Sequence, residues 1–252
     1  MSKQYLYRIS ILNKQSSHPL EAIAYYCGET QYDLLNSKQY QTTTEKKVVW
    51  NNIIIPDRDS SIDKYSNLPD YLKFRTKKTE LISNARNILW QNVYAREKRA
   101  DSQFARLFEL AIPSFLSQEN SVNILQEFSL KLIKEGMIVD GSLHSHNAPV
   151  ASSIFEKLKL INSTESKNDE SVHQDYTAYL MCTLRDYSNG QFVNKNRDWN
   201  NLDKMKEWRQ EWVNILSEHI EKSDTDEIQK NIWLKKFSVY KNTELKNTSL
   251  SI

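Results

Sequence analysis

The sequence predicts an α+β fold, with a mostly antiparallel central sheet of about five strands and helices packed against it. Strand-like and helix-like segments alternate along the 252 residues. Two consecutive strands near the end are joined by a long polar insertion, which favours antiparallel pairing. Glycine and proline are scarce, at 4 and 5 residues, which argues against a loop-rich chain.

The strands are predicted where apolar residues alternate with polar ones or form short runs between turn residues. They span Gln4–Leu12, Lys46–Ile55, Ala105–Ile112, Met137–Ser145 and Tyr176–Arg185. The last of these is almost entirely apolar, which predicts a position in the middle of the sheet.

Helices are predicted where apolar residues recur at helical spacing. A short helix opens at Pro19 and ends before Gly28, and another starts after Ser117 and stops at Gly136. The others are Thr79–Arg96, a long helix at about 202–222 and a shorter one carrying Ile228, Ile232 and Leu234.

The chain is predicted to form a single domain over residues 1–240, followed by a polar tail at 241–252. No apolar run is long enough to span a membrane, and Cys27 and Cys182 sit in apolar stretches, so a cytoplasmic protein is expected. The net charge of +2 is modest, so composition by itself does not predict a DNA partner.

Two side chains are candidates for nucleophilic or acid–base chemistry. Tyr25, on the first short helix beside Tyr26, can serve as a nucleophile, although a tyrosine at the edge of a core is commoner. Glu109 interrupts an apolar strand, so it either faces a site, where it can take up a proton, or lies on the outer surface of the sheet.

Three of the five histidines are candidate metal ligands: His144, His146 and His173. His144 and His146 are two apart, so on a strand they share one face, as a pair of imidazole ligands would. The alternative is a pair of histidines facing solvent near the end of a strand.

A set of basic residues lies near aromatic ones, an arrangement that can hold a single DNA strand through charge and stacking. The candidates for DNA binding are Lys73, Arg75, Lys77, Lys78, Lys195 and Arg197. The alternative is a set of solvated surface charges, with acidic residues among them.

Taken in order, five segments resemble the relaxase domain of the MobA/MobL plasmid-mobilisation family, a branch of the HUH endonucleases. They are EAIAYYCGE after the first strand and the ranges Leu89–Glu119, Gly136–His146, Tyr179–Phe192 and Arg197–Leu216. The resemblance covers roughly residues 4–222 and implies an HUH relaxase-like fold. It places Tyr25 at the family's nucleophile.

The sequence departs from the family at the metal site. The family resemblance implies three imidazoles that hold a divalent ion, Mg²⁺ or Mn²⁺, but Thr177 and Tyr179 replace two of them and only His144 remains. A weak or absent metal site is therefore expected. The remaining alternatives are that His146 and His173 join His144, or that Asp140 or Glu109 helps to hold the ion.

The resemblance implies DNA-strand nicking and joining during plasmid mobilisation and conjugation, through a 5′-phosphotyrosyl link at Tyr25. The implied partners are single-stranded or hairpin DNA at a transfer origin and other mobilisation proteins, with no membrane partner. The alternative is a catalytically inactive HUH-fold descendant that acts as a DNA-binding or protein-interaction module. A third reading, a host-interaction protein without a DNA role, draws on the modest net charge.

Overall fold

The computed structural model describes residues 7–33, 36–41, 47–55, 78–147, 174–188 and 191–242. The strands are β1 Tyr7–Asn13, β2 Gln31–Asp33, β3 Lys38–Tyr40, β4 Lys47–Ile54, β5 Gln103–Ile112, β6 Val139–Asn147, β7 Gln174–Thr183, β8 Arg185–Ser188 and β9 Gln191–Lys195. The helices are α1 Pro19–Cys27, α2 Lys78–Arg96, α3 Gln118–Lys134, the 3₁₀ turn η3 Asp198–Asn200, α5 Leu202–Glu221 and α6 Glu227–Asn242.

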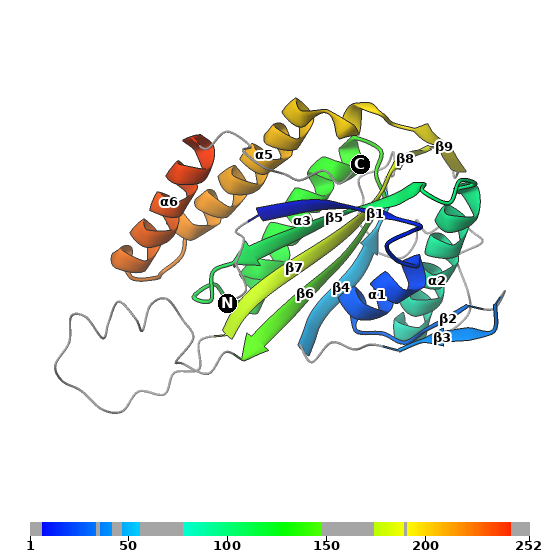
Figure 1. Cartoon of the computed structure of the whole chain (residues 1–252). Coiled ribbons are helices and arrows are strands. Elements are labelled where there is room, and N and C mark those ends of the chain that lie inside the picture. The colour runs from blue at the N-terminus through cyan, green and yellow to red at the C-terminus, as the bar shows by residue number, and fades with distance from the viewer. Residues whose placement is uncertain are drawn as a thin grey trace.

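A five-stranded sheet in the order β1-β5-β7-β6-β4 forms the centre of the molecule, and all four of its strand pairs are antiparallel (Figure 1). The predicted α+β fold and antiparallel sheet are confirmed. The apolar strand predicted to be central is β7, which pairs with β5 on one side and β6 on the other.

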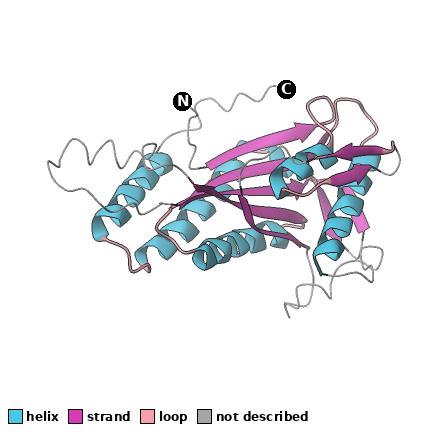
Figure 2. Ribbon diagram, turned by 90° about the horizontal axis from the view of Figure 1, so that it is seen from below, coloured by secondary structure: helices cyan, strands magenta, loops and turns pink. Residues whose placement is uncertain are grey.

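Side chains that alternate along the strands divide the core into two layers. On β7, Ala178 and Leu180 pack with α3 and α5, whereas Tyr179 and Met181 pack with α1 and α2. Helices consequently lie on both sides of the sheet (Figure 2), and α6 lies against α5 (Figure 1). The α1–α2 side is the one that concerns function, because it carries the candidate nucleophile.

Most predicted element boundaries agree with the structure to within a few residues. Gly28 ends α1 with a left-handed φ of 65°, and a Cβ there would lie 2.6 Å from Val48 Cγ2, so both the turn and the close approach require glycine. Ser117 caps α3 as predicted, because its hydroxyl accepts a hydrogen bond from the Asn120 N–H.

Two hairpins were not predicted. β2 pairs with β3, and the β8–β9 hairpin begins where the predicted strand Tyr176–Arg185 was expected to end. Each of these strands has three to five residues in polar sequence, too short to show a period. The tail from 243 onward and most of the polar insertion at 163–174 lie outside the described residues.

His18 caps the N-terminus of α1: its Nδ1 accepts a hydrogen bond from the Leu20 N–H, and its ring stacks on Tyr40. Burial lowers the pKa of His18 below its ordinary 6.5, with nearby Lys38 and Lys14 acting in the same direction and Asp33 and Glu21 opposing them. Because protonated Nδ1 cannot accept a hydrogen bond, the cap requires the neutral ring.

A folded-state pKa below the unfolded value means that this cap stabilises the protein fully above about pH 6.5. The contribution is lost as the pH falls through the folded value. We expect thermal unfolding midpoints to fall more between pH 7.5 and pH 5.5 in the wild type than in His18→Asn, since asparagine also caps but does not titrate. Equal falls in circular-dichroism melts would contradict this assignment.

Candidate active site

The last turn of α1 brings two adjacent tyrosines to the sheet in different environments. Tyr25 is 37% exposed. The ring of Tyr26 meets that of Tyr25 edge-on, with centroids 5.1 Å apart, and its other contact is the ring of Tyr179 at 4.9 Å. Tyr25 is therefore the accessible member of the pair, whereas Tyr26 is held against the sheet.

A row of polar side chains crosses four neighbouring strands beneath these tyrosines. Arg8 pairs with Glu109, Glu109 with Tyr179, and Tyr179 with Ser142 in the strand register. The Arg8 guanidinium lies 3.7 Å from the Glu109 carboxylate, which is 32% exposed. Glu109 therefore lies on the α1 side of the sheet.

Glu109 acts electrostatically on the partly buried Tyr26 and on the buried Tyr179. Burial, followed by the negative charges of Glu109 and Tyr25, raises the pKa of Tyr26 to about 12. The same causes raise the pKa of Tyr179 well above its ordinary value. Neither side chain is therefore suited to form a phenolate at neutral pH.

His144 ties the sheet to the end of α1. It is fully buried in β6, its Nε2 forms a short hydrogen bond with the Tyr26 carbonyl, and its ring meets Tyr179 edge-on. The Ser142 hydroxyl donates to the same carbonyl at 2.6 Å. Since a carbonyl only accepts, the Nε2 of His144 carries the proton in this arrangement and has no lone pair for a metal.

The positions implied for the other two imidazoles lie beside His144. Thr177 is its register partner on β7, and Tyr179 is the partner of Ser142. Within the described part of the chain, no three or more His, Cys, Asp or Glu residues form a group that could hold a metal ion. A carbonyl-bound imidazole, a threonine and a tyrosine do not fit the three-imidazole site that the family resemblance implies.

His146 and His173 cannot be placed in this site, because the side chain of His146 and the whole of His173 lie outside the described residues. Asp140, the alternative carboxylate ligand, is engaged elsewhere. Arg86 Nε lies 2.9 Å from each of its oxygens, and Trp90 Nε1 donates to one of them at 2.9 Å. Asp140 therefore belongs to a buried ion pair that supports the scaffold.

Tyr25 opens onto a broad cavity of about 640 Å³ beside α1 and β3. Tyr26, Glu21 and Lys38 also line this cavity. The Lys38 ammonium lies 4.5 Å from the centre of the Tyr40 ring. The described lining of the cavity therefore includes both the Tyr25 side chain and a cation, Lys38.

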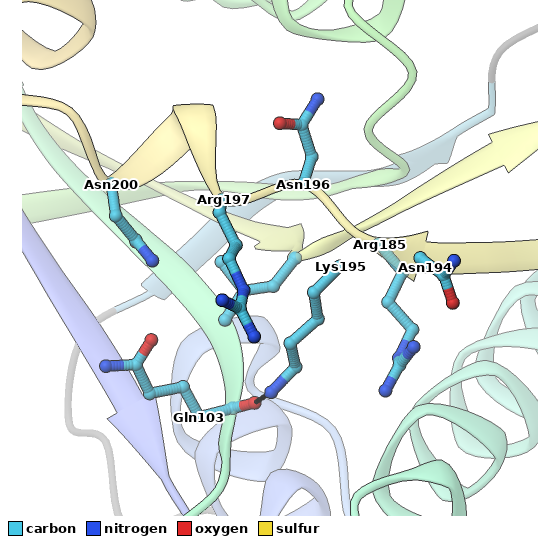
Figure 3. Close-up of a pocket in the computed structure, with 8 residues that line it drawn as sticks. Gln103, Arg185, Asn194, Lys195, Asn196, Arg197 and Asn200 are labelled. Atoms are coloured by element: carbon cyan, nitrogen blue, oxygen red, sulfur yellow. Dashed lines mark hydrogen bonds between the residues drawn. The ribbon is translucent and has the colours of Figure 1, made fainter.

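The structure brings Tyr25, Glu109 and His144 to one region, but it places two of the basic candidates elsewhere. Lys195 and Arg197 line a different cavity at the β8–β9 hairpin (Figure 3). Lys73, Arg75, Lys77 and the side chain of Lys78 lie outside the described residues. Sequence reasoning missed Tyr179 as a stacking partner and Ser142 as a hydrogen-bond donor, although the strand register places both beside the predicted residues.

The profile of the MobA/MobL family matches residues 18–238, a range that includes Tyr25, Glu109 and His144. The chain belongs to the MobA/MobL family. This membership supports a role in plasmid mobilisation and confirms the resemblance seen in the sequence.

One curated relative and one solved structure illustrate what this family member is similar to. The conjugal transfer protein TraA of Rhizobium radiobacter is 35% identical over 66 residues, which are 26% of this chain and 6% of TraA. The chain thus spans only a small part of that relative. A solved structure described as the molecular basis of vancomycin resistance transfer in Staphylococcus aureus has a TM-score of 0.62 at 23% identity, covering 89% of this chain and 96% of that one. This likeness supports the fold.

No helix in the described ranges is both long and apolar enough to cross a membrane.

Proposed function

We propose that this MobA/MobL protein nicks and rejoins a DNA strand during plasmid mobilisation, with Tyr25 as the nucleophile. The Tyr25 oxygen attacks the scissile phosphorus and the bond to the 3′ oxygen breaks. The 3′ oxygen takes up a proton from solvent and leaves as a 3′ hydroxyl. The 5′ phosphate stays on the tyrosine as a phosphodiester, so attack by a 3′ hydroxyl restores the DNA and releases the enzyme.

The observation that carries this proposal is the contrast between the two adjacent tyrosines. Tyr25 is exposed at a cavity, whereas Tyr26 is packed on Tyr179 and its pKa is raised to about 12. A covalent nucleophile has to reach a bulky phosphodiester, and Tyr25 is the more exposed member of the pair.

Glu109 is the proposed acceptor of the tyrosine proton. Its carboxylate is partly exposed and faces the tyrosine cluster, while Arg8 supplies a neighbouring positive charge. A carboxylate at this position can take up the proton that leaves the nucleophile as the ester bond forms.

We further propose that divalent metal ions bind this chain weakly. Thr177 and Tyr179 lie where the family resemblance implies imidazoles, and the His144 Nε2 is engaged by the Tyr26 carbonyl. The substrate proposed is single-stranded or hairpin DNA at a transfer origin, and other mobilisation proteins are the proposed partners.

The second candidate is a DNA-binding protein without nicking activity. The engagement of His144 by a backbone carbonyl favours it, because the imidazole that the family resemblance gives to metal has a structural role here. The two candidates share DNA binding and differ in whether a covalent bond forms.

The test is covalent capture on a denaturing gel. Purified protein is mixed with 3′-labelled single-stranded oligonucleotides covering a plasmid transfer origin, with Mn²⁺ or with EDTA. A protein band carrying the label supports the nicking enzyme. If the band is absent on DNA that the protein binds in a native gel, the result supports a DNA-binding protein without nicking activity.

The role of His144 can be tested with two substitutions. Glutamine keeps an N–H donor near the position of Nε2, whereas alanine leaves the buried Tyr26 carbonyl with Ser142 alone. We expect His144→Ala to lower the free energy of unfolding by about 1–3 kcal/mol, and His144→Gln to recover part of that loss.

The adduct yield of the two variants shows whether His144 positions α1 or binds a metal ion. A positioning role predicts that His144→Gln forms adduct within a few-fold of the wild type. Abolished adduct in a stably folded His144→Gln, together with lost Mn²⁺ binding in a calorimetric titration, would identify His144 as a ligand instead.

A further inference from the structure

A second cavity, of about 720 Å³, lies at the β8–β9 hairpin (Figure 3). Its polar lining consists of cations and amides, including Arg185, Lys195, Arg197, Gln103, Asn194 and Asn200. No carboxylate lines it among the described residues. The volume is within the range of roughly 300–1,000 Å³ that ligand-binding sites occupy.

Two of the three cations share one buried carboxylate as their ion-pair partner. Glu97 is 3.0 Å from Arg185 Nε and 2.7 Å from Lys195 Nζ. The Arg197 side chain, in contrast, forms no hydrogen bond or ion pair with any described residue, and it extends toward the middle of the cavity (Figure 3). Arg197 therefore gives the cavity a positive charge that the surrounding protein leaves unbalanced.

Arg106 adds a second charge behind the cavity wall. It is fully buried, its Nη2 donates to the Asn200 Oδ1 at 2.7 Å, and its Nε and Nη1 have no hydrogen-bond partner in the described ranges. Burial lowers the pKa of Arg106 to about 10, and no carboxylate in the described part of the chain forms an ion pair with it. A buried cation of this kind is stabilised by an anion placed nearby.

The hydrogen bond from Arg106 also fixes which end of the Asn200 amide faces the cavity. Because Oδ1 accepts from Arg106, the NH₂ group of Asn200 is left to point into the cavity, as Figure 3 shows. An N–H donor beside an unbalanced guanidinium is the arrangement that binds a phosphate oxygen.

We propose that this cavity binds one phosphate of a single-stranded DNA, held by the Arg197 guanidinium and the Asn200 amide. The inference rests on the proposed function and deepens it, because it gives the DNA an anchoring point separate from the Tyr25 cavity. Gln103 and Asn194 supply further amides that can contact the adjoining nucleotide.

The test is the salt dependence of DNA binding, measured by fluorescence anisotropy with a fluorescein-labelled twelve-residue oligothymidylate in EDTA. One lost phosphate contact on a single strand lowers the slope of log K against log salt by about 0.7, or roughly fivefold in affinity at 0.1 M salt. Arg197→Ala is expected to show this change. Lys206→Ala, which removes an equal charge from the exposed face of α5, is the matched control and is expected to keep the wild-type slope.

Asn200→Asp is the second variant, because it gives Arg106 a carboxylate partner and so preserves folding while it removes the N–H donor. It is expected to weaken binding at least as much as Arg197→Ala, with an unfolding midpoint no lower than that of the wild type. Slopes equal to that of Lys206→Ala in both variants would overturn the inference, as would a wild type that does not bind the oligonucleotide. Tighter Arg197-dependent binding of thymidine monophosphate than of the oligonucleotide would overturn it in favour of a free nucleotide.

Failure here is distinguishable from failure of the proposed nicking activity. If Arg197→Ala binds DNA with wild-type affinity and still forms an adduct at Tyr25, the anchoring site is refuted and the nicking activity is supported. If the wild type forms no adduct but its DNA binding depends on Arg197, the nicking activity is refuted and the anchoring site is supported.

Discussion

Replacing Tyr25 with phenylalanine is expected to abolish covalent attachment of DNA, reducing adduct formation by at least about a thousandfold, because the variant lacks the attacking oxygen. The ring contact with Tyr26 is kept, so the fold and the affinity for DNA should change little. The measurement is the rate of appearance of labelled protein on a denaturing gel under single-turnover conditions.

Tyr26→Phe is the matched control for this result. It removes a hydroxyl from the neighbouring residue, whose ring is packed on Tyr179 and whose carbonyl, which holds α1 to β6, is untouched. We expect it to form adduct within a few-fold of the wild-type rate. If Tyr26→Phe were inactive and Tyr25→Phe active, the assignment of the nucleophile would be reversed.

The largest expected effect on stability is that of Asp140→Ala. Asp140 accepts from Arg86 and Trp90, and the Cys27 thiol at the end of α1 lies within 3.7 Å of it. The substitution leaves the Arg86 guanidinium in a fully buried site, with Glu29 as its one remaining acidic partner among the described residues. Removal of one member of a buried ion pair costs about 3–5 kcal/mol, and we expect a loss of this size in urea unfolding.

The comparison for this prediction is Asp101→Ala. Asp101 also pairs with an arginine, at 2.6 Å, but both side chains are exposed, so the unfolding midpoint should hardly move. Because Asp140 supports the end of α1, its loss should also lower adduct formation at temperatures where the protein is still folded. A small effect of Asp140→Ala on stability would show that Arg86 finds other partners.

The central sheet could be predicted from the sequence because its strands are long and bury residues on both faces. In β5, Phe108 and Leu110 alternate with Glu109, and this pattern predicted both the strand and the unusual carboxylate. The helix of Tyr25 was equally clear, since Pro19 and Gly28 mark its two ends. The β2–β3 and β8–β9 hairpins were missed because their short polar strands resemble loops.

The sequence singled out Tyr25 and His144 through the family resemblance and Glu109 through its place in an apolar strand. Their contacts with other residues could not be predicted. That the His144 Nε2 is bound to the Tyr26 carbonyl could not be predicted, because a hydrogen bond to a backbone atom 118 residues away leaves no mark in the sequence. The same holds for the pairing of Asp140 with Arg86, which lies 54 residues earlier on α2.

The most direct test of the account is peptide mapping of the covalent complex by mass spectrometry. The wild-type protein is reacted with origin DNA, treated with nuclease and protease, and searched for peptides that carry a nucleotide. The account predicts a nucleotide on Tyr25 in the peptide that spans EAIAYYCGE. A nucleotide on Tyr26, or no modified peptide from protein that demonstrably binds the DNA, would contradict it.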